Sequence, residues 1–397
     1  MDATIAAIST AMSASGIGIV RISGEDAMDV IAKIYRSKNG KKNIREVQSH
    51  TIHYGFIYDG EDVVDEVLVM IMRGPHTYTG EDTVEIDCHG GVYAMKKVLE
   101  TVLKNGAVIA EPGEFTKRAF LNGRLDLSQA EAVMDVIQAK NSMALKSSVE
   151  QLKGSVQRAV KEIRSRLLYQ IAYIESALDD PEHISLDGYP EQLEEQVDQW
   201  KKKIHTLIAS AENGKRMKEG IKTVIVGKPN AGKSSLLNVL LGEERAIVTD
   251  IAGTTRDIVE GQIYLDGIPL NIIDTAGIRK TDDIVEKIGV EKSLAMIDKS
   301  DLVIVVLNRN EKLTTEDLDI LTATEAKTRI IALNKNDLER HINLPLNLEN
   351  VIETNTNDVD GINSLKNKIK QLFNLEQLTM KDYTYLSNSR QISLAKK

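Results

Sequence analysis

Residues 227–234, Gly-Lys-Pro-Asn-Ala-Gly-Lys-Ser, fit the pattern G-x-x-x-x-G-K-[ST], whose residue types suit the binding of a phosphate chain. An apolar run, 223–226, precedes the pattern and an amphipathic stretch, 235–241, follows it, so we expect a loop between a strand and a helix. The glycines allow backbone N–H groups to point at phosphate oxygens, and the start of the helix adds a partial positive charge. We expect Lys233 to reach the β- and γ-phosphates and the Ser234 hydroxyl to bind Mg²⁺.

Two later segments could sense the third phosphate of a nucleotide. In 253–257, Gly-Thr-Thr-Arg-Asp, Thr255 would complete the Mg²⁺ shell when that phosphate is present, because Mg²⁺ requires near-octahedral oxygen ligands. In 274–277, Asp-Thr-Ala-Gly, Asp274 would hold Mg²⁺ through water, and the Gly277 N–H would contact the phosphate.

A fourth segment indicates which base is bound. Residues 334–337, Asn-Lys-Asn-Asp, follow a predicted strand over 329–333. The Asp337 carboxylate can accept two hydrogen bonds from the N1–H and N2–H₂ edge of guanine, whereas adenine offers no such pair of donors. The four segments in this order predict a domain that binds and hydrolyses GTP.

One position in the third segment matters for the chemistry. Many GTPases carry a glutamine directly after Asp-Thr-Ala-Gly, where it orients the attacking water, but this sequence has Ile278. An apolar side chain cannot orient water, so another group must do so, and a bound cation could supply positive charge. The acidic candidates downstream are Asp282, Asp283 and Glu286.

The elements that must position these residues fall into four stretches, in a fold of the α/β plus all-α type. Residues 1–118 predict a small α/β domain, 119–215 a helical domain, 216–379 an inserted Ras-like P-loop domain, and 380–397 the start of a second helical part. In the first stretch we expect strands at 4–9, 18–22, 50–58, 66–72 and 83–87 and helices at 26–35 and 92–103. In the third, a hairpin is expected over 262–265 and 269–274.

The helical part is predicted from its apolar spacing. Apolar residues recur three and four positions apart over 145–178 and again over 193–211, as is typical of long helices that bury one stripe. Two antiparallel helices cannot close a good bundle, so a third helical piece is needed, and the stretch from about Tyr383 is placed to start it. The two ends of the inserted domain would then lie at one face.

Composition narrows the class of protein. The 397 residues are 42% hydrophobic and 27% charged, which is typical of a globular chain of two or three domains. The net charge of −9 argues against a broadly basic nucleic-acid binder. The single cysteine, Cys88, excludes an internal disulfide and fits a reducing cytoplasm, and we find neither a signal peptide nor an apolar run long enough to span a membrane.

At this point the residues resemble the MnmE (TrmE) family of bacterial tRNA-modification GTPases. The resemblance rests on 227–234, 248–257 and 274–279, and also on 16–24 and 111–124, for which a generic GTPase has no counterpart. It extends over essentially the whole sequence. The predicted GTP-binding residues are Asn230, Ala231, Gly232, Lys233, Ser234, Ser235, Thr249, Asp250, Ile251, Ala252, Gly253, Thr254, Thr255, Asp274, Thr275, Ala276, Gly277, Asn334, Lys335 and Asp337, with Ser234 and Thr255 as Mg²⁺ ligands.

The resemblance implies a reaction and a set of partners. Members of this family act with MnmG on C5 of the wobble uridine, U34, of certain tRNAs, where they build an aminomethyl or carboxymethylaminomethyl group. It implies a cytoplasmic homodimer formed through the amino-terminal domain and a heterotetramer with MnmG. That domain would hold 5-formyltetrahydrofolate or a related folate through Arg21, Glu85 and Arg124, the last commonly a lysine in the family.

The resemblance also implies how GTP is hydrolysed. In this family the G domains dimerise around K⁺, which takes the place of an arginine finger. Asn230, Thr249, Ile251 and Thr254 match the K⁺-binding positions, and Glu286 matches the catalytic glutamate that acts through a bridging water. The independent inference drawn from the missing glutamine agrees with that role.

Two departures from the family pattern are visible. Family members continue into a further helical stretch and a cysteine-containing tail, whereas this sequence stops at Lys397, so we expect intact GTPase parts and a truncated helical domain. Residues 354–356, Thr-Asn-Thr, replace the usual Ser-Ala beside the base, and a modest loss of affinity is expected.

The alternative interpretation is an Era-like GTPase, which uses hydrolysis to time a docking step in ribosome assembly. Era-like proteins carry a basic RNA-binding domain after the G domain, and none is recognisable in this sequence. The amino-terminal domain with Arg21 and Glu85 is the feature that distinguishes the two.

Overall fold

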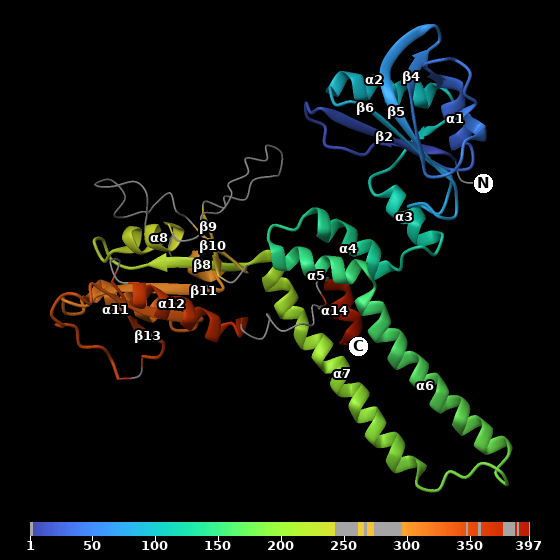
Figure 1. Cartoon of the computed structure of the whole chain (residues 1–397). Helices are drawn as coiled ribbons and strands as arrows, with labels where there is room; N and C mark the ends of the chain where they lie inside the picture. The colour runs from blue at the N-terminus through green and yellow to red at the C-terminus, as the bar shows by residue number, and fades with distance from the viewer. Residues whose placement is uncertain are drawn as a thin grey trace. The chain divides into compact units, whose positions relative to one another are not determined.

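The structure is a computed structural model that describes residues 3–242, 261–265, 268–273, 296–346, 348–355, 359–375, 386 and 389–396. By its internal contacts the chain divides into two compact units. Unit 1 comprises residues 1–134 and 152–157, and unit 2 comprises residues 135–151 and 158–397. Figure 1 labels many of the helices and strands of both.

Unit 1 is built on a seven-stranded sheet with the order β3-β4-β5-β6-β2-β1-β7. Every pairing in it is antiparallel except that of β1 with β7. The strands are β1 (Ile5–Ile8), β2 (Ile17–Ser23), β3 (Tyr35–Ser37), β4 (Thr51–Asp59), β5 (Asp62–Met72), β6 (Thr83–His89) and β7 (Val108–Ile109), and the helices are α1 (Ala27–Ile34), α2 (Val92–Lys104), α3 (Glu114–Leu121) and the beginning of α4 (Leu127–Ile137), with the 3₁₀ turn η1 (Ile44–Glu46). All the elements predicted for residues 4–103 are present, with bounds shifted by a few residues.

One face of this sheet carries the core of unit 1. Helix α1 buries Val30 and Ile31, and α2 buries Val98, in one cluster with alternate residues of the strands. Cys88 on β6 belongs to this cluster at 3% exposure, and burial raises the pKa of its thiol to about 11. The opposite face exposes apolar side chains such as Leu68 and also carries polar groups.

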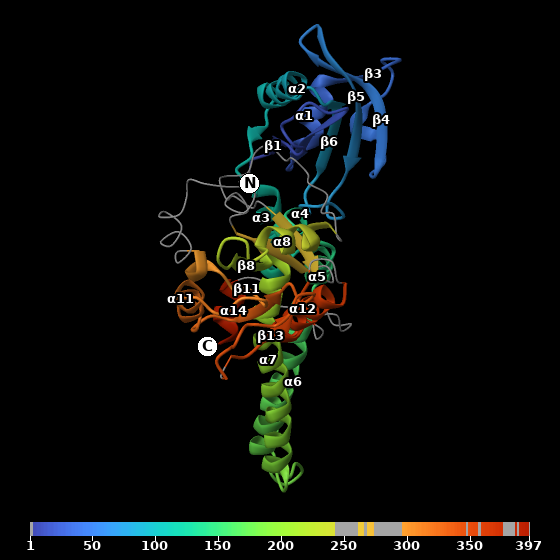
Figure 2. The same cartoon turned by 90° about the vertical axis from the view of Figure 1, so that its left-hand side faces the viewer.

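The helical part of unit 2 consists mainly of two long helices, α6 (Ser155–Asp179) and α7 (Tyr189–Glu219). They lie side by side in Figures 1 and 2, and Gln170 Nε2 donates to Gln196 Oε1 at 2.9 Å between them. The apolar spacing predicted over 145–178 belongs to two helices, because α5 (Ser142–Leu152) ends shortly before α6 begins. A turn at Lys153 and Gly154 interrupts the pattern without changing its period.

The last helix of the chain lies in the stretch expected to hold a third helical piece. It is α14 (Ser389–Ala395), and Gln151 Nε2 donates to Gln391 Oε1 at 3.1 Å. The Leu386 N–H donates to Ser210 Oγ on α7 at 3.4 Å. Among the described residues, no helix is both long enough and apolar enough to cross a membrane.

The rest of unit 2 is a six-stranded sheet with the order β13-β12-β11-β8-β10-β9. All its pairings are parallel except the β9–β10 hairpin, which was predicted. Its elements are β8 (Ile221–Val226), α8 (Lys233–Gly242), β9 (Gly261–Leu265), β10 (Ile268–Ile272), β11 (Leu302–Asn308), α11 (Thr315–Ala323), β12 (Arg329–Asn334), β13 (Val351–Glu353) and α12 (Val359–Leu372). Helices α8 and α12 join one core cluster and α11 joins another, so both faces are covered.

Candidate functional site

The predicted nucleotide-binding segments meet one edge of the six-stranded sheet. Strands β8 and β12 are parallel members of the sheet, and their carboxyl ends lead into residues 227–234 and 334–337 respectively. We call these segments the phosphate loop and the base loop. Strand β10 ends at the same edge, at Ile272, two positions before Asp274. Ligands of open α/β sheets bind beyond the carboxyl ends of such strands.

The phosphate loop has the strained backbone that its sequence predicts. Asn230 has a φ of 61° and Gly232 a φ of 98°, both in the left-handed region. A Cβ atom at Gly232 would lie 2.0 Å from Nδ2 of Asn334, so only glycine fits between the two loops. Ala231 is buried, whereas Ser234 and Ser235 are exposed in the first turn of α8, which begins at Lys233.

Lys233 pairs with no carboxylate among the residues that the structure describes. Its ammonium donates hydrogen bonds of 2.8 Å to the main-chain carbonyls of Gly227 and Lys228. Within the described ranges it forms no ion pair, and burial lowers the pKa of its ammonium, while the negative charge of Glu316 raises it by less. A phosphate chain in the loop would supply the negative charge that this half-buried cation lacks.

The base loop is tied to its neighbours by main-chain and side-chain bonds. Asn334 is 3% exposed, and its Nδ2 donates to the Ala231 carbonyl at 3.0 Å. Lys335 has a φ of 62°, and the Asn336 N–H donates to the Thr354 carbonyl at 3.2 Å. Asp337 is exposed at the sheet edge, as a carboxylate must be to receive a base.

A second lysine of the phosphate loop was not singled out from the sequence. The Lys228 ammonium lies 2.7 Å from Glu311 Oε2 and 3.4 Å from Asp317 Oδ2. Asp317 also completes the capping box at the start of α11 with Thr314. The phosphate loop is thereby held at a fixed distance from α11. Position 228 is unspecified in the loop pattern, so spacing alone could not have revealed this anchor.

Several predicted residues lie outside the part of the chain that the structure describes. They are Thr249, Asp250, Ile251, Ala252, Gly253, Thr254, Thr255, Asp274, Thr275, Ala276, Gly277 and Glu286. The described strands still constrain where these segments attach. Gly261 pairs with Ile272 in the β9–β10 hairpin, so β9 begins beside the end of β10.

The predicted folate residues of unit 1 form a second polar cluster on the outer face of its sheet. Arg21 on β2 and Glu85 on β6 are direct cross-strand partners. The Arg21 guanidinium donates from Nε to Glu85 Oε1 at 2.7 Å, and both side chains are mostly covered. An ion pair at this depth is more than a solvated surface contact.

The structure adds two aromatic residues that the sequence did not indicate. The Arg21 guanidinium carbon lies 5.4 Å from the centre of the Tyr78 ring and 5.5 Å from that of Phe115. The Arg124 guanidinium carbon lies 5.1 Å from the same Tyr78 ring, so both predicted arginines lie against it, and Glu85 joins them through Arg21. Phe115 belongs to the stretch 111–124 that carries the family resemblance, but nothing in the sequence marks Tyr78.

This fold and this first site define the class of protein. A parallel sheet whose strand β8 ends in a phosphate loop, beside a base loop with an exposed Asp337, is the architecture of a P-loop GTP-binding protein. The second polar site, in unit 1, is not part of that architecture and indicates a more specialised family.

Comparison with known proteins identifies the family. Residues 4–124 match the family described as GTP-binding protein TrmE N-terminus, and residues 127–397 match the MnmE helical domain. The chain belongs to the MnmE (TrmE) family. The match of residues 4–124 favours this family over the Era-like alternative.

Curated relatives agree with that assignment. The tRNA modification GTPase MnmE of Lachnoclostridium phytofermentans is 54% identical over 392 residues, which cover 98% of this chain and 85% of that protein. Its counterpart in Clostridioides difficile is 49% identical, with 98% and 86% covered, and that of Bacillus subtilis is 47% identical, with 98% and 87% covered.

Among solved structures, the G domain of the T. maritima FeoB iron transporter is 27% identical over 38% of this chain and 98% of that chain, with a TM-score of 0.27. Era in complex with MgGDPNP and nucleotides of 16S ribosomal RNA is 26% identical over 39% of this chain and 56% of that chain, with a TM-score of 0.28. The strand order and loop geometry, rather than these superpositions, define the fold.

Proposed function

We propose that this chain is a K⁺-stimulated GTPase whose hydrolysis cycle drives modification of C5 of the wobble uridine of tRNA. Membership of a family of tRNA modification GTPases supports this proposal. The observation that carries the GTPase part is the Lys233 ammonium, enclosed by the phosphate loop with two carbonyls and no anion as partners among the described residues. A bound triphosphate completes that arrangement.

Residues of the phosphate and base loops have distinct tasks in this proposal. Lys233 and the start of α8 hold the phosphates, and Asp337 selects guanine. Ser234, with Thr255, would hold Mg²⁺, and the exposed position of Ser234 in the first turn of α8 fits a ligand that faces the phosphates. When bound, Mg²⁺ neutralises charge on the phosphate oxygens.

The proposed K⁺ site lies beside the phosphate loop. Asn230 would contribute its side chain, and its exposure leaves it accessible to an ion. Thr249, Ile251 and Thr254 would contribute the remaining oxygens, and the G domains of two copies would associate there. Glu286 would position the attacking water, because Ile278 cannot.

We further propose that the cluster of Arg21, Glu85 and Arg124 holds 5-formyltetrahydrofolate or a related folate, which supplies the one-carbon unit. A guanidinium-rich cluster with adjacent aromatic rings suits a flat heterocycle that carries carboxylates. Unit 1 would also form the homodimer. MnmG is the proposed partner in a cytoplasmic heterotetramer that acts on tRNA.

The test of the proposed function is GTP hydrolysis in KCl and in NaCl at equal ionic strength, with G-domain association followed in parallel. We expect much faster turnover in KCl, together with association in the presence of a transition-state analogue. Equal rates in the two salts would remove the K⁺ mechanism. Calorimetry that finds ATP bound as tightly as GTP would remove the GTPase assignment itself.

A further inference from the structure

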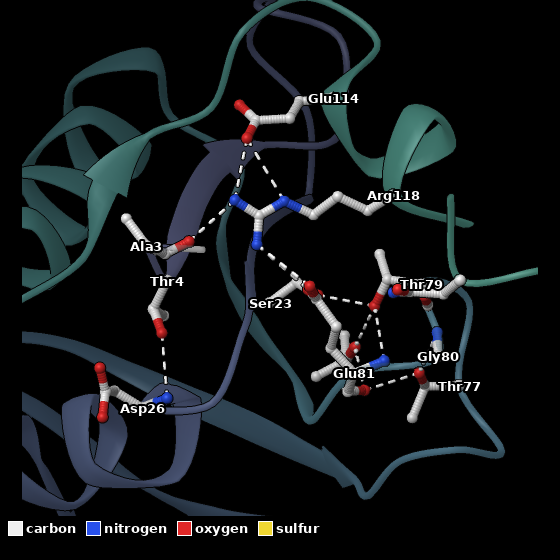
Figure 3. A network of polar contacts seen from close by, with 12 residues as sticks. Ala3, Thr4, Ser23, Asp26, Thr77, Thr79, Gly80, Glu81, Glu114 and Arg118 are labelled. Carbon is white, nitrogen blue, oxygen red and sulfur yellow. Dashed lines mark hydrogen bonds and ion pairs between the residues drawn. The ribbon is translucent and has the colours of Figure 1, made fainter. Parts of the chain in front are cut away.

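Tyr78 is carried by a tightly bonded loop, residues 74–82, between β5 and β6. The residues on either side of it turn inward, with Thr77 at 7% and Thr79 at 0% exposure. Thr79 Oγ1 lies 2.7 Å from Ser23 Oγ, and Thr77 Oγ1 donates to the Glu81 carbonyl at 2.7 Å. Figure 3 shows these contacts of Thr77 and Thr79. The loop therefore has one conformation imposed by buried polar groups.

A buried arginine fastens this loop to α3. Arg118 has only 7% of its side chain exposed, and its guanidinium lies 3.2 Å from Glu81 Oε1 and 2.9 Å from Glu114 Oε1. It also donates to the Ala3 carbonyl at 2.8 Å, and Ser23 Oγ donates to the other oxygen of Glu81 at 2.8 Å. Figure 3 shows the guanidinium between the two carboxylates. The loop and α3 are thus fixed to each other and to β2.

This fixed frame places Tyr78 against two cations. Its hydroxyl lies 2.9 Å from Thr116 Oγ1 of α3, and its ring centre lies within 5.4 Å of both the Arg21 and the Arg124 guanidinium carbons. Glu85 neutralises Arg21. Arg124 is exposed and forms no ion pair with any residue that the structure describes.

Arg124 is the guanidinium at this ring that an anion can reach. Arg21 is paired with Glu85, and the carboxylates of Glu81 and Glu114 are engaged by Arg118, so among the described residues no carboxylate pairs with Arg124. Because Arg21 is already paired with Glu85, a ligand carboxylate at this site would pair with Arg124.

We infer that Tyr78 is a positioning residue of the proposed folate site, whose ring holds the Arg124 guanidinium ready for a carboxylate of the ligand's glutamate tail. This inference rests on the proposed folate function. Tyr78 acts through Arg124, and the hydroxyl contact with Thr116 only orients the ring. The part of Tyr78 that contributes to ligand binding is the aromatic ring and not the hydroxyl.

The experiment measures the binding of 5-formyltetrahydrofolate to the full chain by calorimetry. Tyr78→Leu removes the ring, and we expect its dissociation constant to rise by between about twofold and thirtyfold, the effect of one cation–π contact. Tyr78→Phe keeps the ring, and wild-type affinity is expected. Circular dichroism and thermal unfolding of each variant serve as the control for the folding of unit 1, because GTP turnover reports on unit 2 alone.

A double-mutant cycle separates positioning from a general structural role. In the Arg124→Gln background, Tyr78→Leu is expected to cause little further loss, because the group it positions is already absent and Arg21 is still held by its ion pair with Glu85. An equal loss in both backgrounds would overturn the inference, as would unchanged binding in Tyr78→Leu. A wild-type chain that binds no folate would instead refute the proposed folate function, and the inference with it.

A 5-formyltetrahydropteroate probe, which lacks the glutamate, should bind equally to wild type and Tyr78→Leu. A difference between the two affinities would overturn the inference, because it would place the ring against another part of the ligand.

Discussion

The side chain of Asn334 donates a hydrogen bond of 3.0 Å from Nδ2 to the main-chain carbonyl of Ala231, and this bond joins the base loop to the phosphate loop. Both residues are buried, so the bond is shielded from water. Its consequence is that the two ends of a bound nucleotide are held by parts of the protein that cannot move independently.

At Gly232, the contact between the phosphate loop and the base loop leaves no room for a side chain. We expect Gly232→Ala to weaken GTP binding at least tenfold, because its Cβ would lie 2.0 Å from Asn334 Nδ2, and left-handed strain adds about 1–2 kcal/mol. Binding of a fluorescent GTP analogue is the measurement. Gly40→Ala is the matched control, since Gly40 has a φ of 63° and open space around it, and it should bind normally. Equal affinities in the two variants would contradict the clash.

Asp337 is expected to set the choice of base. Asp337→Asn replaces the carboxylate, which only accepts hydrogen bonds, with an amide that also donates. The affinity for GTP should fall about a hundredfold, because the charge-assisted hydrogen bonds to guanine are lost, and the affinity for xanthosine triphosphate should rise. Competition binding with the two nucleotides measures the exchange. Glu339→Gln, an exposed change two residues later, should alter neither affinity. A variant that still prefers guanine would show that the base is recognised elsewhere.

Glu286 is proposed to position the attacking water. Glu286→Ala should retain GTP binding and lower turnover by roughly a hundredfold to ten-thousandfold, the usual contribution of a general base. Single-turnover hydrolysis in KCl is the appropriate assay. Asp282→Ala and Asp283→Ala, neighbouring acidic changes, should leave turnover close to wild type. An unchanged rate in Glu286→Ala would mean that another group acts as the base.

The ionisation of Glu114 makes the stability of α3 in unit 1 depend on pH. Burial opposes ionisation, but the Glu111 N–H and the Arg118 guanidinium outweigh it and lower the pKa of the Glu114 carboxyl. Its stabilising effect is therefore complete above the unfolded pKa of 4.5 and is lost as the pH falls through the lower folded value. Glu114→Gln should open α3 more readily at pH 7, by about 1–3 kcal/mol, and the difference should shrink below pH 4.5.

Hydrogen–deuterium exchange of α3 peptides, compared between variants at each pH, measures that effect. Glu111→Gln is the control, because the Glu111 side chain is exposed and only its main-chain N–H takes part. If Glu114→Gln and wild type differ by the same amount at pH 7 and at pH 3, the effect comes from packing and not from the charge of Glu114.

Sequence reasoning was most successful where local patterns specify both shape and chemistry. The phosphate loop and its flanking β8 and α8 were predicted with small shifts in their bounds, because glycine spacing and apolar runs determine the backbone directly. The family resemblance named Arg21 and Glu85 as folate residues, but their ion pair across β2 and β6 was not predicted.

The remaining features depend on contacts between distant residues. Tyr78 became relevant only because Arg118 joins residues that are far apart in the sequence, and no local pattern encodes that bond. Likewise, Glu311 and Asp317 hold Lys228 across the sheet edge. The turn at Gly154 was missed because the apolar period continues through it.

The buried state of Cys88 has a practical consequence for measuring motion in this molecule. It is the only cysteine in the sequence, and a thiol that is 3% exposed with a pKa of about 11 forms almost no thiolate at neutral pH. The native chain thus behaves toward maleimide reagents as if it were cysteine-free. A pair of cysteines introduced at exposed positions in the two units could carry spin labels or fluorophores without a prior substitution, and distances between them could be followed through the nucleotide cycle in the unaltered background.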